Sequence, residues 1–257
     1  MRIGFAGAGN MAAAMARGWA RADDGPGSMI FADAGSGRAA ELAKELGGEP
    51  AGSVREAAAN ADLFVLAVKP TALDEVARQL GGSAPPLVSV LAGVTVATIR
   101  AAFPGVPVLR AMPNLPVEVG RGVVCYVRPG DDFPPEVRED ALRMLESLGT
   151  TVPVEENQIE AATAVMSCSP AYVALVSEAL ARAGEREGLD SRLAHEVVVD
   201  ALAGTAELLR SRDPEAIRRA VASPGGATEA GLDALAERDL EAAVQEAVEA
   251  SLERMRR

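Results

Sequence analysis

The chain has 257 residues, of which 49 % are hydrophobic and only 3 % aromatic, and it carries a formal net charge of −12 with an isoelectric point near 4.7. This size predicts one or two globular domains. The acidity argues against a nucleic-acid partner, which needs clustered Lys and Arg, although a local nest of backbone N–H groups can still bind a small anion.

The two cysteines, Cys125 and Cys168, are too few for a disulfide framework, and they are not accompanied by other metal-ligating residues in the sequence. We therefore expect no metal site and a reduced, cytoplasmic location. We also expect no signal peptide, because Met1-Arg2 is followed directly by an apolar strand that ends in glycines. The most apolar long stretch, residues 161–176, is interrupted by polar residues and Pro170. It predicts a buried helix and not a membrane span, and it suggests that the monomer is not the functional form.

Strand-like and helix-like segments alternate through the first half of the chain. We expect strands at 3–6, 29–32, 63–68, 87–91, 108–112, 122–127 and 150–154, and helices at 11–21, 38–46, 73–80 and 95–103. Strand 63–68 is apolar on both faces, as in a parallel sheet that is covered on both sides. The pattern predicts the α/β class, with an N-terminal Rossmann-type doubly wound sheet.

The second half contains only helix-like segments, expected at 158–187, 191–212, 214–222, 227–237 and 240–255. Pro170 should kink or break the first of these helices. The change of pattern near residues 153–157 predicts a dinucleotide-binding domain at 1–155 and an all-helical domain at 156–257.

The first strand is followed by Gly7-Ala8-Gly9-Asn10-Met11-Ala12, a G-x-G-x-x-G/A pattern. Gly7 allows a tight turn, Gly9 lets the backbone approach a pyrophosphate, and Ala12 permits close packing of helix on strand. The free N–H groups of the helix that starts here suit the phosphates. Because the pattern joins a strand to a helix within a βαβ unit, we expect a nicotinamide dinucleotide at Gly7, Gly9, Asn10 and Met11.

Residues at the end of the second strand bear on the choice of dinucleotide. Asp33 suits the ribose 2′-OH of NADH, whereas Ser36 and Arg38 offer contacts for the 2′-phosphate of NADPH. These residues predict either cofactor, with Asp33 favouring NADH slightly.

Three more strands end in clusters that point to the same crevice, because ligands bind beyond the carboxyl ends of strands in an open α/β sheet. The expected cofactor residues there are Val68, Lys69, Pro70, Ala92, Gly93, Met112, Pro113 and Asn114. Each cluster alone is also explained as a turn rich in Pro or Gly.

Four segments in this order resemble the pyrroline-5-carboxylate reductase family. They are Gly7-Ala8-Gly9-Asn10-Met11, Val68-Lys69-Pro70, Arg110-Ala111-Met112-Pro113-Asn114-Leu115-Pro116 and Ser223-Pro224-Gly225-Gly226-Ala227-Thr228. The resemblance covers nearly the whole chain. It implies reduction of the cyclic imine 1-pyrroline-5-carboxylate to L-proline with NADPH or NADH, in proline biosynthesis.

The resemblance also implies that residues 156–257 form a dimerisation and substrate domain. In the family, helical domains interlock in a homodimer, dimers often assemble into a decamer, and each active site uses the neighbouring subunit's helical domain. Ser223, Pro224, Gly225, Gly226, Ala227 and Thr228 are then the substrate-binding residues, with Ser223 and Thr228 as catalytic candidates. From the residues themselves, two glycines before a helix expose N–H groups that suit a carboxylate, although a plain capping turn has the same pattern.

The chain departs from the family pattern at Met166-Ser167-Cys168-Ser169, where Ser-Gly-Ser-Gly or Ser-Gly-Ser-Ser is usual before Pro-Ala-Tyr. This leaves open a related imine as substrate. A hydroxyacid or keto reductase on the same plan is another alternative, but it should place a lysine on the first C-terminal helix, and 158–187 contains none. A non-catalytic dinucleotide-binding protein is the third. The only histidine, His195, is expected at a surface or interface.

Overall fold

The computed structural model describes residues 1–255. Contacts divide the chain into unit 1, Met1–Cys168 with Leu252–Arg257, and unit 2, Ser169–Ser251. The division falls one helix later than the boundary expected at residues 155 and 156, which stays a prediction. The division also assigns the end of the last helix, from Leu252 onward, to unit 1.

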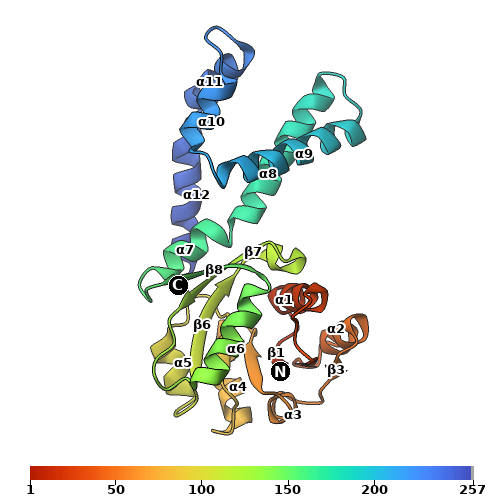
Figure 1. Ribbon diagram of the computed structural model, residues 1–257, viewed down its shortest axis with the longest axis vertical. Helices are drawn as coiled ribbons and strands as arrows, with labels where there is room; N and C mark the ends of the chain where they lie inside the picture. The colour runs from red at the N-terminus through yellow and green to blue at the C-terminus, as the bar shows by residue number, and fades with distance from the viewer. Residues whose placement is uncertain (256–257) are drawn as a thin grey trace. The chain divides into compact units, whose positions relative to one another are not determined.

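Unit 1 is built on one sheet, whose eight strands all lie within residues 1–255 (Figure 1). The strands are β1 (Arg2–Ala6), β2 (Ser28–Ala32), β3 (Glu49–Pro50), β4 (Leu63–Leu66), β5 (Leu87–Ser89), β6 (Val108–Pro113), β7 (Gly122–Val127) and β8 (Gly149–Val154). Their order is β3-β2-β1-β4-β5-β6-β7-β8; the pairs from β3 to β6 are parallel, and β7 runs antiparallel to β6. The predicted Rossmann-type doubly wound sheet is confirmed.

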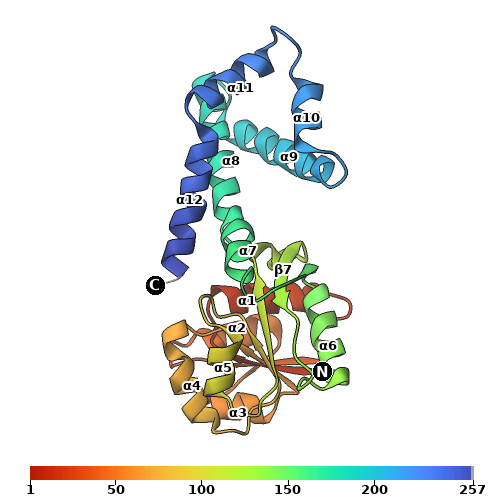
Figure 2. The same ribbon diagram turned by 90° about the vertical axis from the view of Figure 1, so that its left-hand side faces the viewer.

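Helices cover both faces of this sheet, as Figures 1 and 2 show. Residues of α1 (Asn10–Arg21), α2 (Arg38–Leu46) and α6 (Pro135–Glu146) share one hydrophobic cluster. Residues of α3 (Val54–Ala59), α4 (Leu73–Leu80) and α5 (Val96–Ala102) share the other. Alternate residues of β4 join opposite clusters, which explains why this strand is apolar throughout. Two short 3₁₀ helices, η1 (Pro70–Ala72) and η2 (Leu115–Val119), follow β4 and β6.

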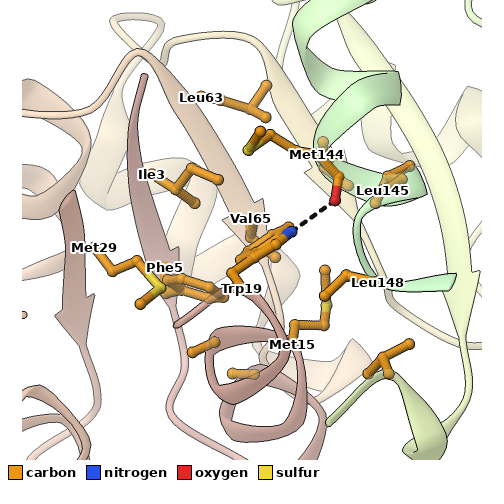
Figure 3. Packing of buried hydrophobic residues seen from close by; sticks show 14 of the residues in the cluster. Ile3, Phe5, Met15, Trp19, Met29, Leu63, Val65, Met144, Leu145 and Leu148 are labelled. Carbon is orange, nitrogen blue, oxygen red and sulfur yellow. Dashed lines mark hydrogen bonds between the residues drawn. The ribbon is translucent and has the colours of Figure 1, made fainter. Parts of the chain in front are cut away.

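The first cluster centres on Trp19 of α1 (Figure 3). Its ring lies 5.8 Å from that of Phe5, which stacks on Phe31 at 5.0 Å. The indole Nε1 donates a hydrogen bond of 2.6 Å to the carbonyl of Met144 in α6. A buried indole needs such a partner, so this bond fixes the end of α1 against α6.

Two helices and one strand of unit 1 were not predicted. Helix α3 opens with the capping-box sequence Ser53-Val54-Arg55-Glu56. Ser53 Oγ accepts the Glu56 N–H, and the Glu56 carboxylate accepts the N–H of Gly52, the residue before the N-cap. Helix α6 has a proline in its first turn, followed by apolar residues at helical spacing. Both signals are visible in the sequence. Strand β3 has only two residues, and pairing with β2 alone defines it.

The chain after β8 is helical throughout its described part. The helices are α7 (Ile159–Met166), α8 (Ser169–Arg186), α9 (Ser191–Leu209), α10 (Pro214–Val221), α11 (Ala227–Glu237) and α12 (Leu240–Met255). The break expected at Pro170 is confirmed, because α8 begins one residue before it. Within unit 2, Tyr172 of α8 hydrogen-bonds Ser251 of α12 at 2.8 Å.

Candidate functional site

The glycine-rich turn after β1 has the geometry that its sequence predicts. Gly7 has a φ of +100°, and its N–H bonds the carbonyl of Ala32 at the end of β2. A Cβ on Gly7 would lie 2.6 Å from the carbonyl oxygen of Ala67, so only glycine fits here. A Cβ on Gly9 would meet no heavy atom of residues 1–255 within 4 Å, and Gly9 is the N-cap of α1. The space beside Gly9 is therefore open, and an anion that enters it can approach the backbone N–H groups at the start of α1.

Asp33 lies just after β2, and four donors engage its carboxylate. Oδ1 accepts the N–H groups of Gly35 and Ser36, while Oδ2 accepts the Ser36 hydroxyl at 2.7 Å and the Ala39 N–H at 2.9 Å. The Ser36 hydroxyl and these N–H groups hold the pKa of Asp33 below its usual range, although burial opposes this. Asp33 thus organises the turn that leads into α2 and has few acceptor sites left for a ribose.

Arg38 connects this turn to α1. Its Nη2 donates a hydrogen bond of 2.9 Å to Oδ1 of Asn10, the first residue of α1. Asn10 and Arg38 are both exposed, and Met11 is half-buried. The structure therefore brings Asn10, Ser36 and Arg38 to one rim of unit 1.

A pocket of about 540 Å³ opens beside the same turn. Residues 33–35 line one side, and residues 52–55 with Gln79 line the other. Sequence reasoning missed this second side, because neither β3 nor α3 was predicted. The capping box at Ser53 and Glu56 was the available signal.

The strand-end clusters share one edge of the sheet, as expected for parallel neighbours. Val68-Lys69-Pro70 follows β4, and both Lys69 and Pro70 are exposed. The exposed pair Ala92-Gly93 follows β5, and Gly93 has a φ of +73°. A Cβ on Gly93 would lie 2.7 Å from the carbonyl oxygen of Met255, so the last turn of α12 packs on this turn.

The third cluster, Met112-Pro113-Asn114, is buried, unlike the other two. Asn114 is 7 % exposed. Its Oδ1 accepts the N–H of Val123 at 2.8 Å, and its Nδ2 donates to the carbonyl of Met166 at 3.1 Å. The side chain expected to contact a cofactor is thus engaged with β7 and the end of α7.

A buried arginine lies on the same strand. Arg110 is 1 % exposed, its Nη1 lies 2.7 Å from Glu156 Oε1, and its Nη2 lies 4.0 Å from Glu160 Oε1. The same Glu156 oxygen accepts the N–H of Val96 at the start of α5. Among residues 1–255, Arg110 Nε and Glu156 Oε2 are buried without a hydrogen-bond partner. The cluster ties β6, α5 and the segment before α7 together.

The expected substrate segment belongs to unit 2 and joins α10 to α11. Gly225 has a φ of +71°, and the Gly226 N–H bonds the carbonyl of Ser223. The carboxylate of Glu229 accepts the Gly225 N–H at 2.7 Å. No side chain of the described residues caps α11 at Gly226, and the exposed Thr228 lies in its first turn. The N–H groups at the start of α11 can bind a carboxylate.

Two other candidates take no part in this geometry. His195 is an exposed residue of α9, and Cys168 is half-buried after α7. Within residues 1–255, no group of His, Cys, Asp and Glu side chains could hold a metal ion.

Comparison with known proteins places this geometry among characterised folds. Residues 156–257 match the family described as pyrroline-5-carboxylate reductase dimerisation, and residues 2–93 match the family described as NADP oxidoreductase coenzyme F420-dependent. A pyrroline-5-carboxylate reductase from Synechocystis is 36 % identical over 99 % of this chain and 97 % of its own length. One from Pseudomonas aeruginosa is 35 % identical over 98 % of this chain and 95 % of its own.

Solved structures give the same result. Pyrroline carboxylate reductase from Plasmodium falciparum with NADP bound superposes with a TM-score of 0.90, at 27 % identity, over all of this chain and 97 % of that one. The 1-pyrroline-5-carboxylate reductase of Streptococcus pyogenes also superposes with a TM-score of 0.90, at 29 % identity, over all of this chain and 98 % of that one.

Proposed function

The chain belongs to the pyrroline-5-carboxylate reductase family, and from that membership we propose that it reduces 1-pyrroline-5-carboxylate to L-proline with NAD(P)H. The open turn at Gly9, at the start of α1, is the observation that carries the proposal. It is combined with full-length similarity to reductases of this name.

Unit 1 binds the dinucleotide in this proposal. The backbone N–H groups after Gly7 and Gly9 hold the pyrophosphate, because the space where a Gly9 side chain would stand is open. Val68-Lys69-Pro70 and Ala92-Gly93 lie at the ends of neighbouring parallel strands and border the same crevice. The pocket between residues 33–35 and 52–55 takes the adenosine.

We propose NADPH as the preferred cofactor, against the slight preference for NADH that Asp33 suggested in the sequence. Four hydrogen bonds already occupy the Asp33 carboxylate, which leaves it a poor acceptor for the ribose 2′-OH. Arg38 and Ser36 lie on the same rim and supply a guanidinium and a hydroxyl for a 2′-phosphate.

The substrate carboxylate is held by the N–H groups at the start of α11, and the Thr228 hydroxyl oxygen accepts a hydrogen bond from the N–H of the protonated imine. Bound NADPH supplies the hydride. The residues of the chain need only bind and orient a protonated imine, since an iminium accepts hydride readily. Ser223 keeps the turn closed through its carbonyl, which accepts the Gly226 N–H.

The homodimer is the minimal unit of this proposal. Few side chains of the C-terminal helices are buried. Among the described residues, none is buried in α8, α10, α11 or α12, and only Ala194 is buried in α9. Apolar side chains such as Leu175 at 65 % and Val244 at 53 % stay exposed. Helices with this pattern need a partner, and a second copy of the domain supplies one. Larger assemblies such as a decamer, and a cytoplasmic location, complete the proposal.

Helices α7 and α8 form an apolar segment. Residues 159–186 are long and apolar enough to cross a membrane by length and composition alone, and 17 % of that window is buried. Ile159, Thr163 and Ala164 of α7 are buried in unit 1, and we assign the exposed part of α8 to the dimer interface.

A charge on the exposed face of α8 tests the dimer. Val176→Glu should convert the dimer to a monomer, as measured by sedimentation. Val119→Glu, in η2 of unit 1 and similarly exposed, is the matched control.

The test of function is oxidation of NADPH, and separately of NADH, by 1-pyrroline-5-carboxylate, followed by nicotinamide absorbance and by the appearance of proline. Gly9→Ala should leave the fold intact and weaken dinucleotide binding at least about tenfold, because the methyl occupies the phosphate's approach. Gly27→Ala, where a Cβ meets only an ordinary contact at 3.6 Å, is the control. No proline from the wild-type protein would reject the proposal.

A further inference from the structure

The end of helix α7 is fastened to the end of strand β6 by two side-chain hydrogen bonds. Asn114 Nδ2 donates to the carbonyl of Met166 at 3.1 Å, and Ser167 Oγ donates to the carbonyl of Pro113 at 3.1 Å. The two bonds run in opposite directions between neighbouring residues of the two segments. They form a clamp, defined here as Pro113-Asn114 with Met166-Ser167.

The orientation of the Asn114 amide follows from its surroundings. The Val123 N–H can only donate, so the amide oxygen faces β7 and the nitrogen faces the Met166 carbonyl. The Asn114 backbone is engaged as well, because its N–H bonds Val123 and its carbonyl accepts the Val117 N–H. With 7 % exposure, this side chain is turned away from solvent. Its contacts are those of a structural link.

The clamp lies where the chain passes from unit 1 into unit 2, since Ser169 begins unit 2. The chain returns to unit 1 at Leu252, and Met255 then packs on Gly93 at the end of β5. Strands β5 and β6 are hydrogen-bonded neighbours in the sheet. Both passages of the chain between the units are therefore anchored at the edge where the cofactor clusters lie.

We propose that Asn114 and Ser167 are positioning residues, which fix the end of α7 on the cofactor edge of unit 1 without binding the dinucleotide. This rests on the proposed function, because the substrate segment at Ser223–Thr228 lies in unit 2. Loosening the clamp leaves the cofactor residues of unit 1 in place but frees the end of α7, from which the chain continues into the helical domain that carries the substrate segment. Imine turnover falls while dinucleotide affinity stays.

The test uses Asn114→Asp and Ser167→Ala in the full-length oligomer. Asn114→Asp keeps the acceptor for the Val123 N–H but sets an oxygen against the Met166 carbonyl. Ser167→Ala removes the second bond together with the weaker contact of Ser167 Oγ with Met166 Sδ at 3.3 Å. Asn60→Asp and Ser147→Ala are matched controls, because each loses a side-chain hydrogen bond to a backbone carbonyl, on Glu56 and Met144 respectively.

Each clamp variant should lower kcat/KM for the imine about tenfold, while the dissociation constant for NADPH, titrated by nicotinamide fluorescence, changes less than about twofold. Amide hydrogen exchange across residues 159–168 should become faster in both variants and stay at the wild-type rate in the controls. Ser167→Ala decides the matter if Asn114→Asp fails to fold.

If Asn114→Asp weakens NADPH binding by the same factor by which it lowers imine turnover, Asn114 is a cofactor ligand and the proposal is overturned. Unchanged kinetics and unchanged exchange in the clamp variants would overturn it as well. A wild-type protein that never reduces 1-pyrroline-5-carboxylate rejects the proposed function instead. Hydrogen exchange and the NADPH titration would still show whether the clamp exists.

Discussion

Replacing Glu156 by alanine should cost the protein more stability than replacing Arg110 by methionine, although both substitutions break the same ion pair. The two partners differ in their access to water. The Arg110 side chain is 1 % exposed, whereas that of Glu156 is 37 % exposed. A charge that loses its partner has to be solvated by water instead, and of these two side chains only that of Glu156 is accessible to water.

The magnitude follows from the contacts that each substitution leaves behind. Without Glu156, the buried guanidinium retains only Glu160 at 4.0 Å, and the Val96 N–H loses its acceptor. A stranded buried charge costs about 3–5 kcal/mol, and the lost amide bond adds about 1 kcal/mol. Methionine at position 110 fills similar space without a charge, and the partly exposed Glu156 can be solvated while it still accepts the Val96 N–H. This change should cost about 1 kcal/mol.

The assay is urea unfolding at one fixed protomer concentration, because oligomer stability depends on concentration. Asp132→Ala is the control. It breaks an ion pair in which the Arg100 side chain is 42 % exposed and the Asp132 side chain 49 % exposed, so it should cost less than about 1 kcal/mol. If Arg110→Met proves as costly as Glu156→Ala, then burial of the arginine does not determine the energetics of the cluster and the reasoning fails.

Three further outcomes are expected. Trp19→Phe should lower the free energy of unfolding by about 1–3 kcal/mol, since the Met144 carbonyl loses its buried donor; an unchanged urea midpoint would contradict this. Donors lower the pKa of Asp33, so the stability it contributes is full above the pKa of an unfolded carboxyl and is lost as pH falls through the lowered value. Asp33→Asn should remove this loss, measured by urea unfolding across an acid series, and an unaltered acid profile would refute the assignment. Burial raises the pKa of the Cys125 thiol, so in Cys168→Ala protein a thiol reagent should label it only after unfolding; rapid labelling of the native protein would count against the buried position.

Local sequence patterns predicted most of the fold. The alternation of apolar strands and helices identified the doubly wound sheet, and the break at Pro170 followed from ring geometry alone. The missed helices α3 and α6 had usable signals, a capping box and an N-terminal proline. Strand β3 had none, because two residues become a strand only when β2 pairs with them.

The sequence by itself determined the features that depend on neighbouring residues: the turn at Gly7, the start of α1 at Gly9 and the helix start after Gly226. Only the tertiary structure decided what each polar side chain faces. The sequence predicts Asp33 and Asn114 as cofactor ligands, and this stays a prediction. Only the fold shows that the Asp33 carboxylate bonds the start of α2 and that the Asn114 amide bonds the end of α7. A hydrogen bond of this kind joins residues far apart in the chain, and their approach depends on how the whole sheet and its helices pack. The residue types alone do not contain that information.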